Sequence, residues 1–116
     1  MAEAACGLAQ LEQAQNFIEK RKENFNFLHN RLLACEEFLI LPEATPHSNP
    51  SWFGFPISLK EDAPVARLEL LQYLDQKKVG TRLLFAGNLI RQPYMLGRNF
   101  RVSGSLENTD LVMNQT

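Results

Sequence analysis

The sequence predicts an α+β fold in which a long N-terminal helix and a second helix pack on a small, mainly antiparallel sheet. Residues 2–34 contain no Gly after Gly7 and no Pro, and they are rich in good helix formers. Residues 63–78 repeat apolar side chains at helical spacing, and residues 38–41, 52–58 and 81–85 are short β-prone runs between turn signals. This mixed order of elements favours a small antiparallel sheet with helices over one face.

We expect residues 2–34 to form one helix with an apolar stripe along one side. Its positions alternate spacings of three and four residues, and Arg21 is the one member that is not apolar. Because an apolar stripe is stable only when it is covered, we expect it to pack on a sheet or on another helix. The stripe consists of Leu11, Ala14, Ile18, Arg21, Phe25, Leu28 and Leu32.

Two short strands are expected next, separated by an irregular loop. Residues 38–41 form an apolar run that stops at Pro42, and residues 42–51 hold three prolines together with Ser, Thr and Asn. Residues 52–58 resume as an aromatic strand. Pro56 cannot donate a hydrogen bond to a strand ladder, which favours an edge position or a bulge there.

The second helix is expected over roughly residues 63–78. Asp62 is a plausible N-cap, Pro64 fits the first turn, and Gly80 follows the basic pair Lys77 and Lys78 as a stop signal. A further strand is expected over residues 81–85, then a turn-rich stretch over 86–93, and residues 108–110 resemble the cap of a final helix. With no internal repeat, residues 1–116 are expected to form a single domain.

Composition narrows the classes of partner. The hydrophobic content of 45% and charged content of 22% are those of a folded globular chain. The net charge of -1, from 12 basic and 13 acidic residues, provides no basic field for nucleic acid. No apolar stretch is long enough to span a bilayer and residues 1–15 lack a leader pattern, so no membrane partner and a cytoplasmic location are expected.

The sequence holds few residues that could carry chemistry by themselves. Cys6 and Cys35 are too far apart in sequence for a metal-binding pair and too few for an iron–sulfur cluster, so we interpret them as reduced apolar fillers. His29 and His47 have no partner at a metal-ligand spacing and are expected at the surface. Catalytic residues and metal ligands are therefore predicted to be absent from residues 1–116.

One segment carries more polar chemistry than a plain scaffold needs. Residues 80–93 read GTRLLFAGNLIRQP and place Arg82, Asn88, Arg91 and Gln92 around an apolar run and a flexible glycine. Arginine offers a fork of donors to phosphate or carboxylate, and the amides can pair with sugar hydroxyls. From these residues alone, both a loop that faces a ligand and a solvated connection stay open.

That segment belongs to a wider resemblance, together with residues 1–13 (MAEAACGLAQLEQ), 52–57 (WFGFPI) and 108–116 (NTDLVMNQT). Over essentially its whole length the chain resembles the C-terminal region of the sugar-nucleotide aminotransferase family, fold type I. Within that family it is similar to the CDP-4-keto-6-deoxyglucose 3-dehydrase branch of lipopolysaccharide biosynthesis. The opening block is shared broadly, whereas GTRLLFAGNLIRQP and TDLVMNQT are specific to the dehydrase branch.

The resemblance implies a small C-terminal domain that closes over a CDP-sugar bound to a large domain carrying pyridoxal or pyridoxamine phosphate (PLP or PMP). It also implies that the enzyme has a homodimer partner. A [2Fe-2S] cluster and a separate NADH-dependent reductase would supply the electrons for the synthesis of a 3,6-dideoxysugar. Residues for proton transfer, cofactor phosphate and cluster ligation have no counterpart here, so the chain is expected to bind no cofactor and to be inactive alone. The loop supplies the substrate-contact or closure candidates Arg82, Phe85, Asn88 and Arg91.

Residues 1–116 are accordingly expected to be a fragment that lacks the large PLP-binding domain and the last strand. Apolar side chains around residues 1–8, which the large domain would cover, are expected to be exposed. Two alternatives stay open, the small domain of a PLP-dependent sugar-nucleotide aminotransferase and a non-catalytic binding or assembly module that reuses this domain. A histidine or a lysine at the cofactor position, which these residues do not include, would separate dehydrase from aminotransferase.

Overall fold

The computed structural model describes residues 2–116, which group into two compact units. One unit runs up to Cys35 and includes Leu41–Phe55, and the other comprises Glu36–Ile40 and Pro56–Thr116. A single domain over residues 1–116 stays a prediction. Among the described residues no helix is long and apolar enough to cross a membrane.

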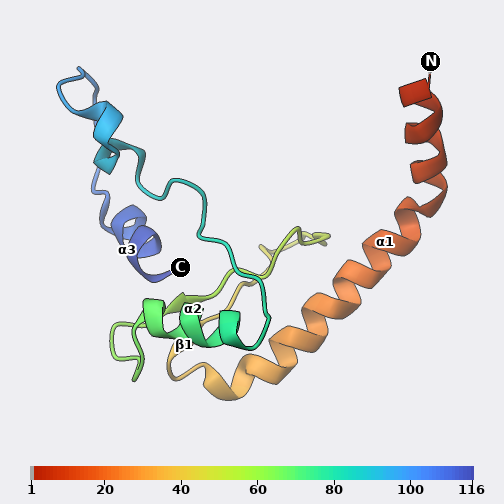
Figure 1. The fold of residues 1–116 in the computed structure, drawn as a ribbon, viewed down its shortest axis with the longest axis horizontal. Coiled ribbons are helices and arrows are strands. Elements are labelled where there is room, and N and C mark those ends of the chain that lie inside the picture. The colour runs from red at the N-terminus through yellow and green to blue at the C-terminus, as the bar shows by residue number, and fades with distance from the viewer. Residues whose placement is uncertain (1) are drawn as a thin grey trace. The chain divides into compact units, whose positions relative to one another are not determined.

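The first unit is dominated by the helix α1 (Ala2–Leu32), which continues as the short 3₁₀ helix η1 (Leu33–Cys35) (Figure 1). This confirms the predicted long helix to within two residues of its end. Of the predicted stripe, Ala14, Ile18, Phe25 and Leu32 are half-buried, whereas Leu11 is 69% exposed. In the first turns Cys6 and Leu8 are exposed as expected, and Met1 lies outside the described residues.

An aromatic cluster joins α1 to residues 52–55 within this unit. The Phe25 ring stacks on Trp52 with centroids 4.7 Å apart and an interplanar angle of 5°, and it also contacts Phe55 at 5.0 Å. His29, expected at the surface, is half-buried and stacks with Phe25, with ring centroids 5.9 Å apart. Part of the predicted stripe is thus covered by loop residues of its own unit, rather than by the sheet or helix we expected.

The second unit contains the small sheet. Strands β1 (Leu39–Ile40) and β2 (Ser58–Leu59) are antiparallel, with Leu39 opposite Leu59, and Lys60 N–H extends the ladder to the Phe38 carbonyl at 2.9 Å. Leu59 is the buried hydrophobic residue of the described chain at 3% exposure. The antiparallel sheet is confirmed, but the predicted strand over residues 52–58 shrinks to its last residue. Pro56 explains this, because it removes a ladder donor just before the pairing begins.

Helix α2 (Arg67–Gln76) is confirmed, but both of its predicted end signals are wrong. Its N-cap position is Ala66 rather than Asp62, and the Glu69 carboxylate accepts a hydrogen bond from Ala66 N–H at 2.9 Å. Pro64 disfavours helical geometry at Ala63, which excludes that residue from the helix, and the contact of Glu69 with Ala66 N–H stabilises the start at Arg67. At the other end Lys78, not Gly80, adopts the left-handed backbone, with φ of 62°.

The predicted strand over residues 81–85 is not present, because these residues are irregular and have no partner strand in the described chain. The segment continues into the short 3₁₀ helices η2 (Leu89–Arg91) and η3 (Pro93–Met95). Helix α3 (Glu107–Gln115) confirms the final helix, although residues 108–110 lie in its first turn and do not cap it. Ser105 Oγ instead accepts from Glu107 N–H at 3.2 Å.

Arg67 connects α2 to the end of α3. Its Nη1 atom donates to the Met113 carbonyl at 2.6 Å and to the Thr116 carbonyl at 3.0 Å. Cationic donors at a helix C-terminus satisfy carbonyls that lack partners within the helix. The Ser58 and Thr116 hydroxyls are hydrogen-bonded, so β2 is joined to α3 as well.

Candidate functional site

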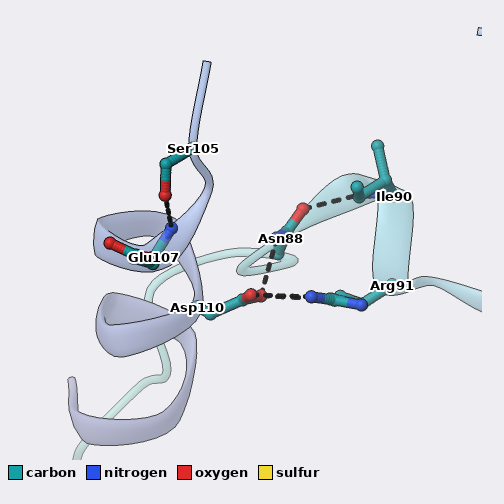
Figure 2. Close-up of polar contacts among 6 residues, drawn as sticks. All are labelled: Asn88, Ile90, Arg91, Ser105, Glu107 and Asp110. Atoms are coloured by element: carbon teal, nitrogen blue, oxygen red, sulfur yellow. Dashed lines mark hydrogen bonds and ion pairs between the residues drawn. The ribbon is translucent and has the colours of Figure 1, made fainter. Parts of the chain in front are cut away.

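The loop over residues 80–93 is seated on α3 through the side chain of Asn88. Asn88 is 2% exposed, and its Nδ2 atom donates to Asp110 Oδ1 at 2.7 Å (Figure 2). Its Oδ1 atom accepts from Ile90 N–H at 3.2 Å and so caps η2. A buried amide is stable when its donor and acceptor are both satisfied, as they are here. Asn88 is therefore a structural anchor of the loop.

Arg91 shares the same carboxylate. Its Nε atom lies 3.2 Å from Asp110 Oδ1 and its Nη2 atom lies 2.8 Å from Oδ2, the two-point pairing that suits a guanidinium (Figure 2). Hydrogen bonds from Arg91 and then Asn88 hold the pKa of Asp110 below its usual value. The side-chain hydrogen bond between Arg91 and Asp110 in turn raises the pKa of Arg91. Both groups stay charged at neutral pH.

The loop makes a second close approach to α3 at Gly87. This glycine has φ of 62°, and a Cβ atom built on it would lie 2.4 Å from Met113 Cγ. Only glycine meets both demands at this position, a left-handed backbone and contact without a side chain. The Gln92 amide closes the turn by donating from Nε2 to the Ala86 carbonyl at 2.6 Å.

Phe85 and Arg82 are presented to solvent by this arrangement. Phe85 is 92% exposed and has φ of 46°, an uncommon backbone for a bulky residue. Its N–H donates to the Leu83 carbonyl at 2.8 Å, and Gly87 N–H donates to the Leu84 carbonyl at 3.2 Å, which folds the chain around it. Arg82 is also exposed. Because strained backbone conformations are common at functional sites, Phe85 stays a candidate for contact with a ligand.

An open groove of about 380 Å³ runs along the base of the loop. Leu84, Phe85 and Gln92 line it from the loop, and Val112 and Met113 line it from α3. The lining is mixed, because Arg67, Asn114 and Thr116 also contribute to it. Among the described residues no group of three or more His, Cys, Asp or Glu side chains could hold a metal ion. The arrangement can bind and orient a molecule.

The four sequence-predicted site residues thus fall into two pairs. Asn88 and Arg91 are brought together on Asp110, whereas Arg82 and Phe85 are exposed and have no part in that contact. Their roles toward a substrate stay predictions. Sequence reasoning placed Asp110 only in a helix cap and missed it as the partner of the loop. The available signal was that residues 76–106 contain no Asp or Glu, so that Arg91 has no acidic partner near it in sequence.

The described residues do not fit either of the groups that the resemblance implies. An iron–sulfur cluster needs four ligands, whereas Cys6 and Cys35 are free and exposed. A cofactor lysine needs a desolvated amine, whereas none of the five lysines is buried: Lys20, Lys77 and Lys78 are exposed, and Lys22 and Lys60 are half-buried. We derive no chemical step through either group from this chain, and its expected lack of a cofactor stays a prediction.

Comparison with known proteins gives consistent results. The model of the DegT/DnrJ/EryC1/StrS aminotransferase family matches residues 1–116. The chain is 62% identical over 114 residues to the lipopolysaccharide biosynthesis protein RfbH of Salmonella typhimurium, covering 98% of this chain and 26% of the relative. It is 40% identical to the dTDP-4-dehydro-2,6-dideoxy-D-glucose 3-dehydratase of Saccharopolyspora spinosa, covering 98% of this chain and 24% of the relative.

A more distant relative and a solved structure agree with these matches. The GDP-4-keto-6-deoxy-D-mannose 3-dehydratase of Yersinia pseudotuberculosis is 32% identical over 92 residues, covering 79% of this chain and 23% of the relative. A crystal structure of a ColD variant matches with a TM-score of 0.82 at 24% identity, covering 94% of this chain and 28% of that one. This structural match shows the fold, and the chain spans about a quarter of the length of its relatives.

Proposed function

Because the chain belongs to the DegT/DnrJ/EryC1/StrS aminotransferase family, we propose that it is the small-domain part of a sugar-nucleotide 3-dehydratase. The observation that carries this proposal is 62% identity over 98% of the chain to a lipopolysaccharide biosynthesis protein. Two further relatives, at 40% and 32% identity, are named as 3-dehydratases of nucleotide-linked 4-keto deoxysugars. The reaction would belong to the longer protein, of which residues 1–116 form one part.

The proposed substrate is CDP-4-keto-6-deoxyglucose, and the product would enter the synthesis of a 3,6-dideoxysugar for lipopolysaccharide O-antigen. The segments GTRLLFAGNLIRQP and TDLVMNQT support this choice by resemblance to the CDP-sugar branch. PLP or PMP would supply the electron sink for loss of the 3-hydroxyl group. The homodimer partner, the [2Fe-2S] cluster, the NADH-dependent reductase and a cytoplasmic location are part of the same proposal.

Within this chain, we propose that the loop over residues 80–93 forms one edge of the substrate site. Arg82 would offer its guanidinium to a phosphate or sugar oxygen, and Phe85 would offer an exposed ring face. Asn88 and Arg91 would act indirectly, since their polar groups are already engaged by Asp110. This division supports a role in binding and orienting substrate, with the proton transfers carried out elsewhere in the enzyme.

The activity is tested on the full-length purified protein loaded with PMP, together with an NADH-dependent reductase. We expect loss of the 3-hydroxyl from CDP-4-keto-6-deoxyglucose, and slower reaction with the dTDP- and GDP-linked 4-keto sugars. Product is identified by mass spectrometry, because dehydration and transamination give different masses. Formation of an amino sugar from an amino donor would overturn the dehydratase assignment in favour of an aminotransferase.

The role of the loop is tested with Arg82→Ala in the same protein. Loss of a charge-assisted contact of about 1.5–3 kcal/mol corresponds to roughly a ten- to hundredfold weaker apparent affinity for the CDP-sugar. Arg101→Ala is the matched control, because Arg101 is also an exposed arginine of the same unit. If both variants keep the KM and kcat of the unaltered enzyme, Arg82 has no part in substrate binding.

A further inference from the structure

We propose that Asp110 is a positioning residue, which holds the loop over residues 84–92 in the shape that presents Phe85 to the substrate. This inference rests on the proposed function. It is carried by one carboxylate that accepts hydrogen bonds from two separate loop residues, Asn88 and Arg91. Asp110 lies on α3, and the loop residues that it binds are 19 and 22 positions away in sequence.

The contact with Asn88 makes the carboxylate hard to replace. Asn88 is 2% exposed, so its amide hydrogens have no access to solvent if Asp110 stops accepting. An unpaired buried donor is costly, and a rearrangement of the loop is the way to relieve it. The opposite atom of the same amide accepts from Ile90 N–H, so movement of Asn88 also releases the start of η2.

The contact with Arg91 fixes the other side of the carboxylate. Both Asp110 oxygens are engaged, Oδ1 by Asn88 and Arg91 Nε, and Oδ2 by Arg91 Nη2. An asparagine at position 110 would keep one of the two acceptor oxygens and replace the other by an N–H₂ group. That N–H₂ group would face the Asn88 amide or the Arg91 guanidinium, and both of these offer only N–H donors on that side. Glutamate would keep the charge but place it one methylene further from α3.

The loop also contacts α3 at a second point, the close approach of Gly87 to Met113. The conformation of the loop therefore depends on its contacts with this helix. Met113 lies one turn beyond Asp110 and is the residue that Gly87 approaches most closely. Phe85, with φ of 46°, is two residues before Gly87, and a strained backbone of this kind persists when its surroundings hold it. Loss of the Asp110 contacts therefore allows the Phe85 backbone to leave its strained conformation, which moves the ring from the place where it would contact the substrate.

The test compares Asp110→Asn with Asp75→Asn in the full-length protein. Asp75 is an exposed carboxylate on α2, so its variant makes the same chemical change away from the loop. For Asp110→Asn we expect KM for CDP-4-keto-6-deoxyglucose to rise about tenfold with kcat within about twofold, because substrate positioning is lost and the catalytic groups are intact. A variant that merely unfolds part of the enzyme would lower kcat and leave KM unchanged, which would overturn the inference.

Amide hydrogen exchange provides a readout that does not need activity. Peptides covering residues 84–92 should exchange about tenfold faster in Asp110→Asn, and at the normal rate in Asp75→Asn. Asp110→Glu, which keeps the charge, should restore part of the protection and part of the KM. Normal exchange in Asp110→Asn would overturn the inference whatever the enzyme does.

The outcomes for the two proposals differ. If the unaltered protein turns over none of the 4-keto sugar nucleotides, the proposed function fails, and exchange in residues 84–92 alone decides whether Asp110 positions the loop. If exchange becomes faster in Asp110→Asn while an active enzyme keeps its KM, the loop does not present substrate contacts and the inference is wrong. Faster exchange together with a raised KM supports it.

Discussion

Replacement of Gly87 by alanine should destabilise the loop through two separable effects. The first is backbone strain, because φ of 62° is costly for any residue with a Cβ atom, by about 1–2 kcal/mol. The second is overlap, because the new Cβ would lie 2.4 Å from Met113 Cγ and 2.9 Å from Met113 Cβ. Overpacking typically costs about 1–3 kcal/mol, and the upper half of that range applies because Met113 Cβ is fixed to the backbone of α3 and cannot move by a change of rotamer. The total expected loss is about 4 kcal/mol.

Gly97 offers a matched control for the strain. It has φ of 73°, and no heavy atom of the described chain other than those of its neighbours lies within 4 Å of a Cβ built on it. Gly97→Ala should therefore cost only the backbone strain, about 1–2 kcal/mol. Urea unfolding of the full-length protein, with the exchange of residues 84–92 as a local readout, measures both variants. The difference between them is the cost of the Met113 overlap.

A double variant identifies the neighbour responsible. If Met113 causes the overlap, Gly87→Ala combined with Met113→Ala should lose less stability than the sum of the two single changes, by about 1 kcal/mol or more. The reasoning is refuted if Gly87→Ala costs no more than Gly97→Ala, or if the two changes at Gly87 and Met113 are simply additive. Either result would mean that the loop is not seated on α3 at this point.

Three further predictions concern separate contacts. The lowered pKa of Asp110, caused by its arginine and asparagine partners, means that its contribution to stability is present above the usual aspartate pKa of about 3.9 and is lost as pH falls through the lower folded value. The gap in melting temperature between the unaltered protein and Asp110→Asn should therefore narrow as pH falls below about 4, and a gap that does not change with pH would contradict this. Phe25→Ala should cost about 2 kcal/mol in urea unfolding and increase solvent quenching of Trp52 fluorescence, since the two rings stack at 4.7 Å. Glu69→Ala should cost about 0.5–1 kcal/mol by removing the acceptor for Ala66 N–H, whereas Glu69→Gln, which retains an acceptor, should cost less.

The sequence by itself determined the helices and the family. Residues 2–34 are helical over almost their whole predicted length because good helix formers run without interruption by proline. The segments that carried the resemblance led to the family whose model matches residues 1–116. The ends of α2 were predicted less well. A helix start depends on local competition, here between Pro64 and the Glu69 side chain that satisfies Ala66 N–H.

Only the tertiary structure decided what residues 81–91 do. An apolar run such as residues 81–85 forms a strand when a neighbour supplies its hydrogen bonds, and the described chain provides none there. In the fold Asn88 and Arg91 bind Asp110, 22 and 19 residues away, which the local sequence did not indicate. Their contacts with a substrate stay a prediction. A local sequence pattern does not distinguish a polar side chain that binds a ligand from one that binds another residue. The role depends on which partner the fold brings within hydrogen-bond distance, about 3 Å.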